Sequence, residues 1–162
     1  MRNAILRRLR AVELFAECKR ADLAAIDRLG VTLDVDAGRT LCRYGDVRKE
    51  FFVLLAGLGE VSTPQGSLAA LLPGAWFGET VFLRGGGRRA TVMAAKPSTL
   101  LVFGPREFNT LLKTAPGVRA RLEATAARVG DGRTPTVERW YQPLTPDVAA
   151  IARTAREPAQ HS

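Results

Sequence analysis

The segment from Phe77 to Val92 carries residue types that could hold a phosphate group. Gly78 and Glu79 open what reads as one turn of helix, and three consecutive glycines then lead to Arg88 and a strand. A helix N-terminus attracts anions through its unpaired N–H groups and its dipole. Glycine lets the backbone approach a ligand closely, and the arginine fork matches phosphate oxygens. We therefore expect this segment to bind a phosphate.

Short apolar stretches separated by turn signals surround this segment. The near-continuous apolar run 50–56 is typical of a buried strand, and 31–35 alternates apolar with polar residues. Regular spacing of such strands predicts a compact antiparallel barrel or sandwich. The expected strands are 31–35, 40–44, 50–56, 60–62, 67–72, 91–95 and 100–103.

Helical patterns flank the predicted strands on both sides. Residues 3–29 place apolar side chains at helical spacing, with Asp22 as the expected N-cap and Gly30 as the stop. Pro105 suits the first turn of a helix, and a second helix is expected over 118–129. The sequence thus predicts the order helix, β-barrel, helix pair.

The remaining segment, 131–162, predicts a largely irregular tail because it holds four prolines. Trp140 and Tyr141 lie in it, and they could either cap a ligand site or dock the tail on the barrel. The sequence leaves both alternatives open.

Composition narrows the class of protein. The chain has 162 residues, enough for one domain with a tail, and no stretch approaches the roughly 18 apolar residues that a membrane span needs. We expect no membrane insertion and a cytoplasmic location. The net charge of +8 is spread along the chain, which favours a solvated arginine-rich surface over a nucleic-acid patch. Cys18 and Cys42 lack metal or redox spacing and are interpreted as reduced thiols.

Catalytic chemistry has little support in the sequence. The only histidine, His161, lies one residue from the end, and no cluster of Cys, His and carboxylates has metal-ligand spacing. Glu79 alone does not make an active site. We expect no catalytic residues, no metal and no cofactor.

The order of these elements, with the phosphate-binding segment inside it, resembles the cyclic-nucleotide-binding domain family over about residues 5–130. The order and spacing of several landmarks together carry the resemblance. The landmarks are Val12-Glu13-Leu14-Phe15, Ala37-Gly38, Tyr44-Gly45-Asp46, Phe51-Phe52-Val53-Leu54-Leu55-Ala56-Gly57, Leu72-Pro73-Gly74-Ala75-Trp76-Phe77-Gly78-Glu79, the run Arg88 to Ala94, Phe108 and Pro116.

The resemblance implies an α+β fold in which N-terminal and C-terminal helices flank an antiparallel, jelly-roll-like β-barrel. This is the barrel of cyclic AMP receptor-like and protein kinase A regulatory-like proteins, here as a stand-alone bacterial-type domain over residues 1–130 with 131–162 as its tail. The implied ligand is cyclic AMP or a related cyclic nucleotide.

The resemblance also implies a role for each matching position. Gly78 would let the phosphate or ribose approach the backbone, Glu79 would accept a hydrogen bond from the ribose 2′-OH, and Arg88 would pair with the cyclic phosphate. Thr80, Val81, Arg89 and Ala90 would offer backbone N–H groups. Two positions depart from the family pattern: Val81 and Arg89 stand where small residues are usual. A hydroxyl at the position of Arg89 is associated with recognition of guanine, so cyclic AMP is expected in preference to cyclic GMP.

Three functions are compatible with this reading, in decreasing order of support. The first is a regulatory module in which the nucleotide rearranges helices around the barrel. This rearrangement would control an effector protein that the sequence does not identify. Such a module is compatible with a homodimer. The second is a degenerate domain of the same fold, used for protein interaction or assembly. The third is a DNA-binding regulator, disfavoured because the segment beyond Val129 is too short for a two-helix reader with its own core.

Overall fold

The computed structural model describes residues 2–79, 81, 86–88, 90–129 and 141–143. Helical segments precede and follow the strands along the chain, as the sequence predicts. The helical segments are α1 (Arg2–Arg10), the 3-10 turn η1 (Glu13–Phe15), α2 (Arg20–Leu29), α4 (Pro105–Thr114) and α5 (Pro116–Val129). The strands are β1 (Val31–Val35), β2 (Thr40–Cys42), β3 (Phe51–Ala56), β4 (Gly59–Thr63), β5 (Gly66–Leu71), β6 (Trp76–Phe77), β7 (Thr91–Ala94), β8 (Ser98–Phe103) and β9 (Tyr141–Pro143).

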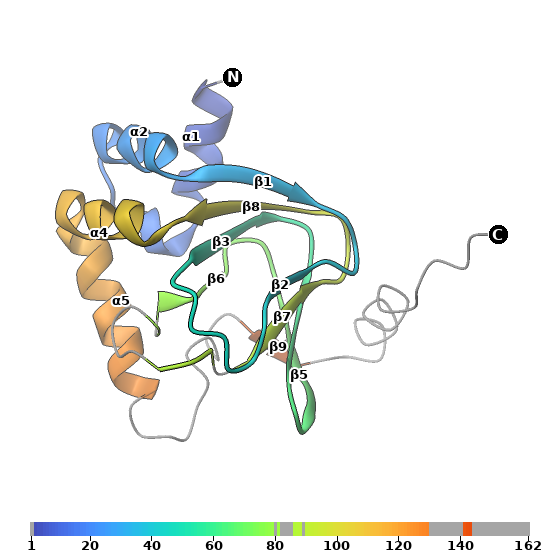
Figure 1. Ribbon diagram of the computed structural model, residues 1–162. Helices are drawn as coiled ribbons and strands as arrows, with labels where there is room; N and C mark the ends of the chain where they lie inside the picture. Colours follow the sequence, from blue (N-terminus) through green and yellow to red (C-terminus); the bar gives the residue numbers. More distant parts are fainter. Residues whose placement is uncertain (1, 80, 82–85, 89, 130–140, 144–162) are drawn as a thin grey trace.

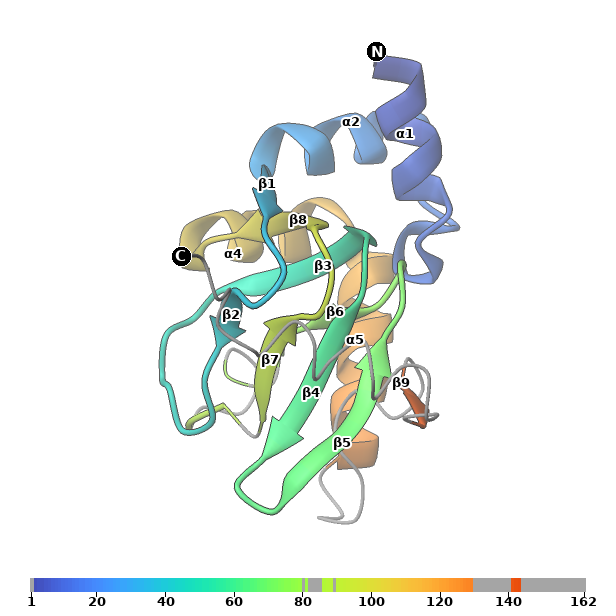
Figure 2. The same cartoon turned by 90° about the vertical axis from the view of Figure 1, so that its right-hand side faces the viewer.

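Within the described residues, the strands form two antiparallel sheets. One has the order β1-β8-β3-β6, and the other has the order β2-β7-β4-β5-β9. Figure 1 shows β1, β8 and β3 side by side, and Figure 2 shows β7, β4 and β5 in the foreground, with the turn between β4 and β5 at their far end. The sheets face each other in a jelly-roll-like arrangement without closing into one continuous barrel. This confirms the predicted α+β class.

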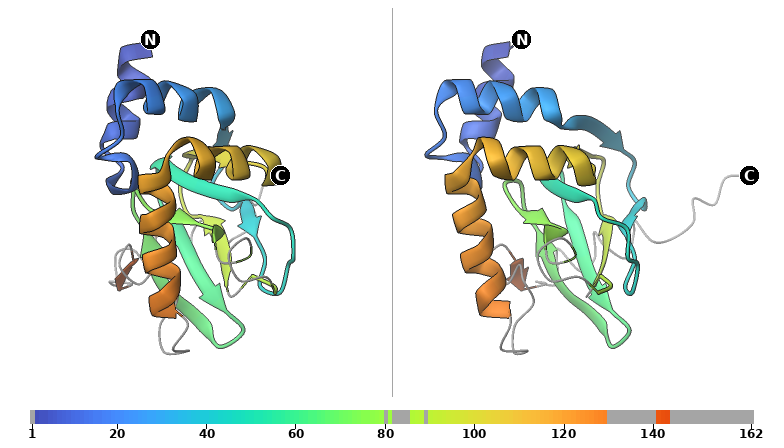
Figure 3. Two further views of the ribbon diagram at one scale, coloured as in Figure 1. Left: turned by 90° about the vertical axis from the view of Figure 1, so that its left-hand side faces the viewer. Right: turned by 60° about the vertical axis from the view of Figure 1, so that its left-hand side comes forward.

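Two apolar cores lie on opposite faces of the four-stranded sheet. The core that we call the barrel core lies between the sheets and includes Phe52, Leu54 and Leu100. The core that we call the helical core lies on the other face, where α1, η1, α2, α4 and α5 pack against Phe51, Val53 and other residues of β3 and β8. Because β3 is buried on both faces, its sequence is apolar at nearly every position. Figure 3 shows the helices gathered on this side of the strands.

The N-terminal helical region differs from its prediction in detail. The predicted run over 3–29 is interrupted between α1 and α2, with only η1 in the intervening segment. Lys19, rather than Asp22, is the N-cap residue of α2, and the Asp22 carboxylate accepts a hydrogen bond of 3.3 Å from the backbone N–H of Lys19. Asp22 therefore caps the helix from its third position. Gly30 ends α2 as predicted, and a Cβ there would lie 2.6 Å from Leu101.

Two strands were not predicted. Strand β6 has only two residues, and β9 lies in the segment for which an irregular tail was expected. The backbone of Tyr141 pairs with Leu71 of β5, so this part of the tail docks on the five-stranded sheet. Trp140 lies outside the described residues.

Candidate functional site

Gly78 follows β6 and has a φ of +104°, in the left-handed region that favours glycine. A Cβ at this position would lie 2.3 Å from the carbonyl oxygen of Glu50 and 2.6 Å from Nη1 of Arg88. The sequence predicted that this glycine makes room for a ligand. The structure shows that it makes room for the guanidinium of Arg88 and for the backbone at the start of β3.

Arg88 is held by its backbone and by one edge of its side chain. Its N–H donates to the carbonyl of Asp46 at 2.7 Å, and its carbonyl accepts from the N–H of Gly45 at 2.8 Å. Its Nη2 donates to the carbonyl oxygen of Glu50 at 2.8 Å, and the guanidinium carbon lies 5.9 Å from the centre of the Phe52 ring. The side chain is only 5% exposed, yet Nε and Nη1 donate to no atom of the described residues.

Glu79 is the second charged group of the site. It is helical and fully buried, and neither carboxylate oxygen accepts a hydrogen bond of ordinary geometry from the described residues. Burial raises the pKa of Glu79 to about 7, while its own backbone N–H and the positive charge of Arg88 act in the opposite direction. Such a carboxyl group has unused hydrogen-bonding capacity, and a hydroxyl that entered the site would find an acceptor.

The other predicted site residues are placed as follows. Val81 is helical and 2% exposed, and Ala90 is partly buried against the barrel core. Thr80 and Arg89 lie outside the described residues. The structure therefore brings Gly78 and Arg88 into contact and places Glu79 within electrostatic range of Arg88.

Sequence reasoning missed the residues that hold Arg88. Glu50 and Asp46 act through backbone carbonyls, which every residue has, so no side-chain pattern could reveal them. Phe52 was part of the predicted buried strand, and its ring stacks on Phe77 with the ring centres 4.7 Å apart. Phe77 therefore packs in the barrel core, whereas Trp76 packs in the helical core. Leu122 of α5 is fully buried in the helical core.

The described part of the chain offers no second group of residues for metal or disulfide chemistry. Those residues contain no group of three or more Cys, His, Asp or Glu side chains that could hold a metal ion. Both cysteines are free thiols, and burial raises the pKa of each. His161 lies outside the described residues. A search of the described helices finds none with the length and apolar character that a membrane crossing requires.

The structure thus combines two facing antiparallel sheets, helices packed on one of them, and a buried carboxylate and guanidinium next to β6. The profile of the family described as "Cyclic nucleotide-binding domain" matches residues 32–115, more than half of the chain. The chain belongs to the cyclic nucleotide-binding domain family.

Curated relatives share this domain within longer proteins. The chain is 34% identical over 116 residues to the cyclic nucleotide-gated potassium channel mll3241 of Mesorhizobium japonicum, which covers 72% of this chain and 32% of the channel. It is 31% identical over 118 residues to the acetyltransferase Pat of Mycolicibacterium smegmatis, covering 70% of this chain and 35% of that protein. The chain thus spans about a third of the length of these relatives.

Solved structures show the same fold at lower identity. The catabolite activator protein of Thermus thermophilus superposes with a TM-score of 0.65 at 23% identity, covering 74% of this chain and 58% of that one. The second cyclic-nucleotide domain of a PKA regulatory chain, bound to Sp-2Cl-cAMPS, superposes with a TM-score of 0.69 at 18% identity. That match covers 85% of this chain and 96% of the other.

Proposed function

We propose that this domain binds a cyclic nucleotide through Glu79 and Arg88, with cyclic AMP preferred to cyclic GMP. The observation that carries the proposal is the buried pair of charged side chains whose hydrogen-bonding capacity is unused among the described residues. Buried polar groups in folded proteins are almost always hydrogen-bonded, so a pair of this kind calls for a polar ligand.

The chemistry of a cyclic nucleotide matches the two groups. A cyclic phosphodiester carries one negative charge and cannot ionise further, so Nε and Nη1 of Arg88 can donate to its oxygens and balance that charge. The ribose 2′-OH can donate to the carboxylate of Glu79. In this proposal the segment around Gly78 and the backbone N–H groups of Thr80, Val81, Arg89 and Ala90 complete the phosphate site.

The preference for cyclic AMP rests on residue type. Position 89 holds an arginine, so it lacks the hydroxyl that the family resemblance associates with guanine. Similar folds are described with the same ligand: the PfPKA-R structure contains cAMP, and so does the regulatory domain of Toxoplasma gondii PKA. These neighbours are below 25% identical and support only the choice of ligand to test first.

The proposed mechanism is a shift in helix packing that an effector protein detects. The helical core joins α1, η1, α2, α4 and α5 to β3, the strand that also carries Phe52 beneath Arg88. Arg121 of α5 pairs with Glu17 at 2.9 Å and donates to the backbone carbonyl of Glu13. A ligand that moves Arg88 or the start of β3 would therefore favour one arrangement of these helices over another. The domain acts by binding and carries out no reaction of its own.

Calorimetric titration of the purified protein with cyclic AMP and with cyclic GMP tests the proposal. We expect saturable heat with cyclic AMP and weaker binding of cyclic GMP. Replacement Arg88→Ala should weaken cyclic AMP by about 100-fold or more, because the phosphate would be left without its charged partner. Arg106→Ala, at an exposed position of α4, is the control and should bind normally. No heat and no thermal stabilisation with either nucleotide at millimolar concentration would refute the proposal.

A second function is favoured by one observation. Glu79, Val81 and Arg88 are all at least 95% buried, an enclosure that also suits a domain whose site has lost its ligand and which serves in assembly. In that case the melting temperature would be the same with and without either nucleotide, and the protein would form a stable oligomer or partner complex. Light scattering alongside the titration separates the two functions.

A further inference from the structure

The proposed nucleotide site would bring three ionisable or charged groups into one enclosed space. Arg88 supplies one positive charge, and the phosphodiester of a cyclic nucleotide would supply one negative charge. Glu79 is fully buried and Arg88 is only 5% exposed, so water screens this pair little. If Glu79 were ionised in the complex, two anions would share one guanidinium, and the site would hold an unbalanced negative charge. A buried carboxyl group avoids that cost by keeping its proton.

The hydrogen bonds of the site are compatible with a protonated Glu79. A protonated carboxyl group keeps a carbonyl oxygen, which can accept from the ribose 2′-OH as a carboxylate would, and its own O–H becomes a donor. Both oxygens of Glu79 are buried and accept no hydrogen bond from the described residues, so both are available to the ligand. The ribose contact therefore does not require the charged form.

Arg88 is the one cation among the described residues that acts on Glu79. Burial raises the pKa of Glu79 to about 7 in the nucleotide-free domain, and the positive charge of Arg88 opposes this rise. A phosphate bound to Nε and Nη1 of Arg88 would offset that positive charge. The pKa of Glu79 should therefore rise further when the nucleotide binds.

The neighbouring titratable groups do not imitate such a change. Cys42 is influenced by Arg88, Asp46 and Glu50, but burial is the main effect and raises the pKa of the thiol, so it stays neutral. Asp46 accepts hydrogen bonds from the backbone and the side chain of Arg48, which lower its pKa, so it stays ionised. Neither group changes its charge near neutral pH.

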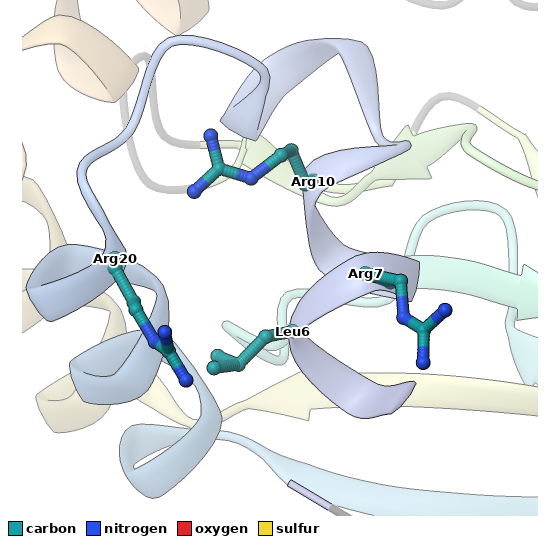
Figure 4. Close-up of a pocket in the computed structure, with 4 residues that line it drawn as sticks. All are labelled: Leu6, Arg7, Arg10 and Arg20. Atoms are coloured by element: carbon teal, nitrogen blue, oxygen red, sulfur yellow. The ribbon is translucent and has the colours of Figure 1, made fainter. Parts of the chain in front are cut away.

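A second basic region of the molecule lacks this property. Leu6, Arg7, Arg10 and Arg20 line a pocket of about 330 Å³ at α1 and α2. Figure 4 shows three guanidinium groups and one aliphatic side chain around it, and no acidic residue is among the lining residues. Because arginine keeps its proton throughout the pH range of folded proteins, the charge of that lining does not depend on pH. The nucleotide site differs in pairing its arginine with a buried carboxyl group.

We propose that the site binds a cyclic nucleotide together with one proton, which resides on Glu79 in the complex. This inference rests on the proposed function, because it concerns the regulation of the same site. Above neutral pH the proton comes from solvent, and the bound state is electrically balanced by Arg88, the phosphodiester and a neutral Glu79. The domain thus responds to pH as well as to nucleotide concentration, and it binds more tightly as the pH falls through the neutral range.

Calorimetric titration with cyclic AMP from about pH 6 to about pH 8.5 tests the proposal. The fraction of nucleotide-free domains that hold the proton falls steeply above the Glu79 pKa of about 7, so the apparent affinity should fall about tenfold or more over this range. Glu79→Gln places a neutral side chain at the position and should remove the pH dependence, whatever its absolute affinity. Glu123→Gln, the same replacement at an exposed position of α5, is the control and should follow the wild-type profile.

Proton counting gives a second readout that needs no variant. The same titrations, run in two buffers with different ionisation enthalpies, should show uptake of most of one proton per nucleotide at about pH 8 and much less at about pH 6. An affinity that is independent of pH or rises with pH, or a release of protons on binding, would overturn this inference and leave the proposed function standing. Absence of nucleotide binding at every pH would overturn both.

Discussion

Arg88 and Arg10 of α1 carry their positive charge in opposite surroundings. Arg88 is enclosed, with its backbone fixed by Gly45 and Asp46 and one edge of its guanidinium fixed by Glu50. Arg10 lies in water at the surface. An enclosed guanidinium can discriminate between anions by shape, because any anion that fits badly leaves buried donors unsatisfied. An exposed one loses little with a poor partner and therefore selects mainly by charge.

The largest effect is expected from Gly78→Ala, which removes the space that Arg88 occupies. The new Cβ would lie 2.3 Å from the carbonyl oxygen of Glu50, at a backbone φ of +104°. Backbone strain and overpacking together should lower the free energy of unfolding by about 3 kcal/mol or more and abolish nucleotide binding. Gly45→Ala is the matched control: it has a φ of +81° but nothing within 4 Å, so it should cost only about 1 kcal/mol. Urea denaturation of both variants compares them, and equal costs would show that the space at Gly78 is not needed.

The next largest effect concerns the pH dependence of stability. Because burial raises the pKa of Glu79 from 4.5 to about 7, the folded state holds a proton that the unfolded state has released between these values. The contribution of Glu79 is therefore fully present below pH 4.5 and is lost as the pH rises through 7. Replacement Glu79→Gln should remove this dependence. Between pH 5 and pH 8 the nucleotide-free wild-type protein should lose about 3 kcal/mol more than the variant in urea denaturation. If the wild-type protein and the variant lose the same free energy of unfolding between pH 5 and pH 8, Glu79 is not enclosed.

A smaller effect is expected where the Phe52 ring lies against Arg88. Phe52→Leu keeps an apolar side chain in the barrel core but removes the ring face, 5.9 Å from the guanidinium carbon. Cation–π contacts are worth about 0.5–2 kcal/mol, so cyclic AMP should bind about 3- to 10-fold more weakly. Phe77→Leu removes the stacked partner ring and leaves Phe52 beneath Arg88, which makes it the control in the same calorimetric titration. If both variants bind alike, packing rather than the ring face supports Arg88.

The smallest effect is expected from Arg10→Ala, on the exposed side of the comparison. An exposed arginine contributes little to folding, so the free energy of unfolding should change by less than about 0.5 kcal/mol. Arg88→Ala, measured in the same urea series, should cost more because it empties an enclosed position. Equal costs would contradict the distinction between the enclosed arginine and the exposed one.

The sequence predicted most of the fold because apolar periodicity reports burial directly. Strand β3 was identified by its continuous apolar run, and the structure shows that the run arises from burial on both faces. Strand β6 could not be identified in this way, since two residues define no period. Strand β9 depends on pairing with β5, some seventy residues earlier in the chain, and local composition carries no record of such a partner.

The site was predictable to the extent that it uses side-chain chemistry. Gly78, Glu79 and Arg88 were selected by residue type and spacing, and the structure places Arg88 against Gly78. The contacts that hold Arg88 could not be predicted, because they come from main-chain carbonyls and from one face of strand β3. The apolar run 50–56 predicted that Phe52 would be buried, but it could not reveal which sheet face Phe52 occupies or that Arg88 lies above it.

The alternation of side chains along β3 ties the strand to one register. Its alternate residues belong to different cores, Phe51 and Val53 to one and Phe52 and Leu54 to the other. Point substitutions in it can be absorbed locally, but a shift of its pairing with β8 by one residue would exchange the two sets. The ring beneath Arg88 would then face the helices, and an anchor of the helices would face Arg88. The register of β3 therefore links the packing of the helices to the position of the ring beneath Arg88.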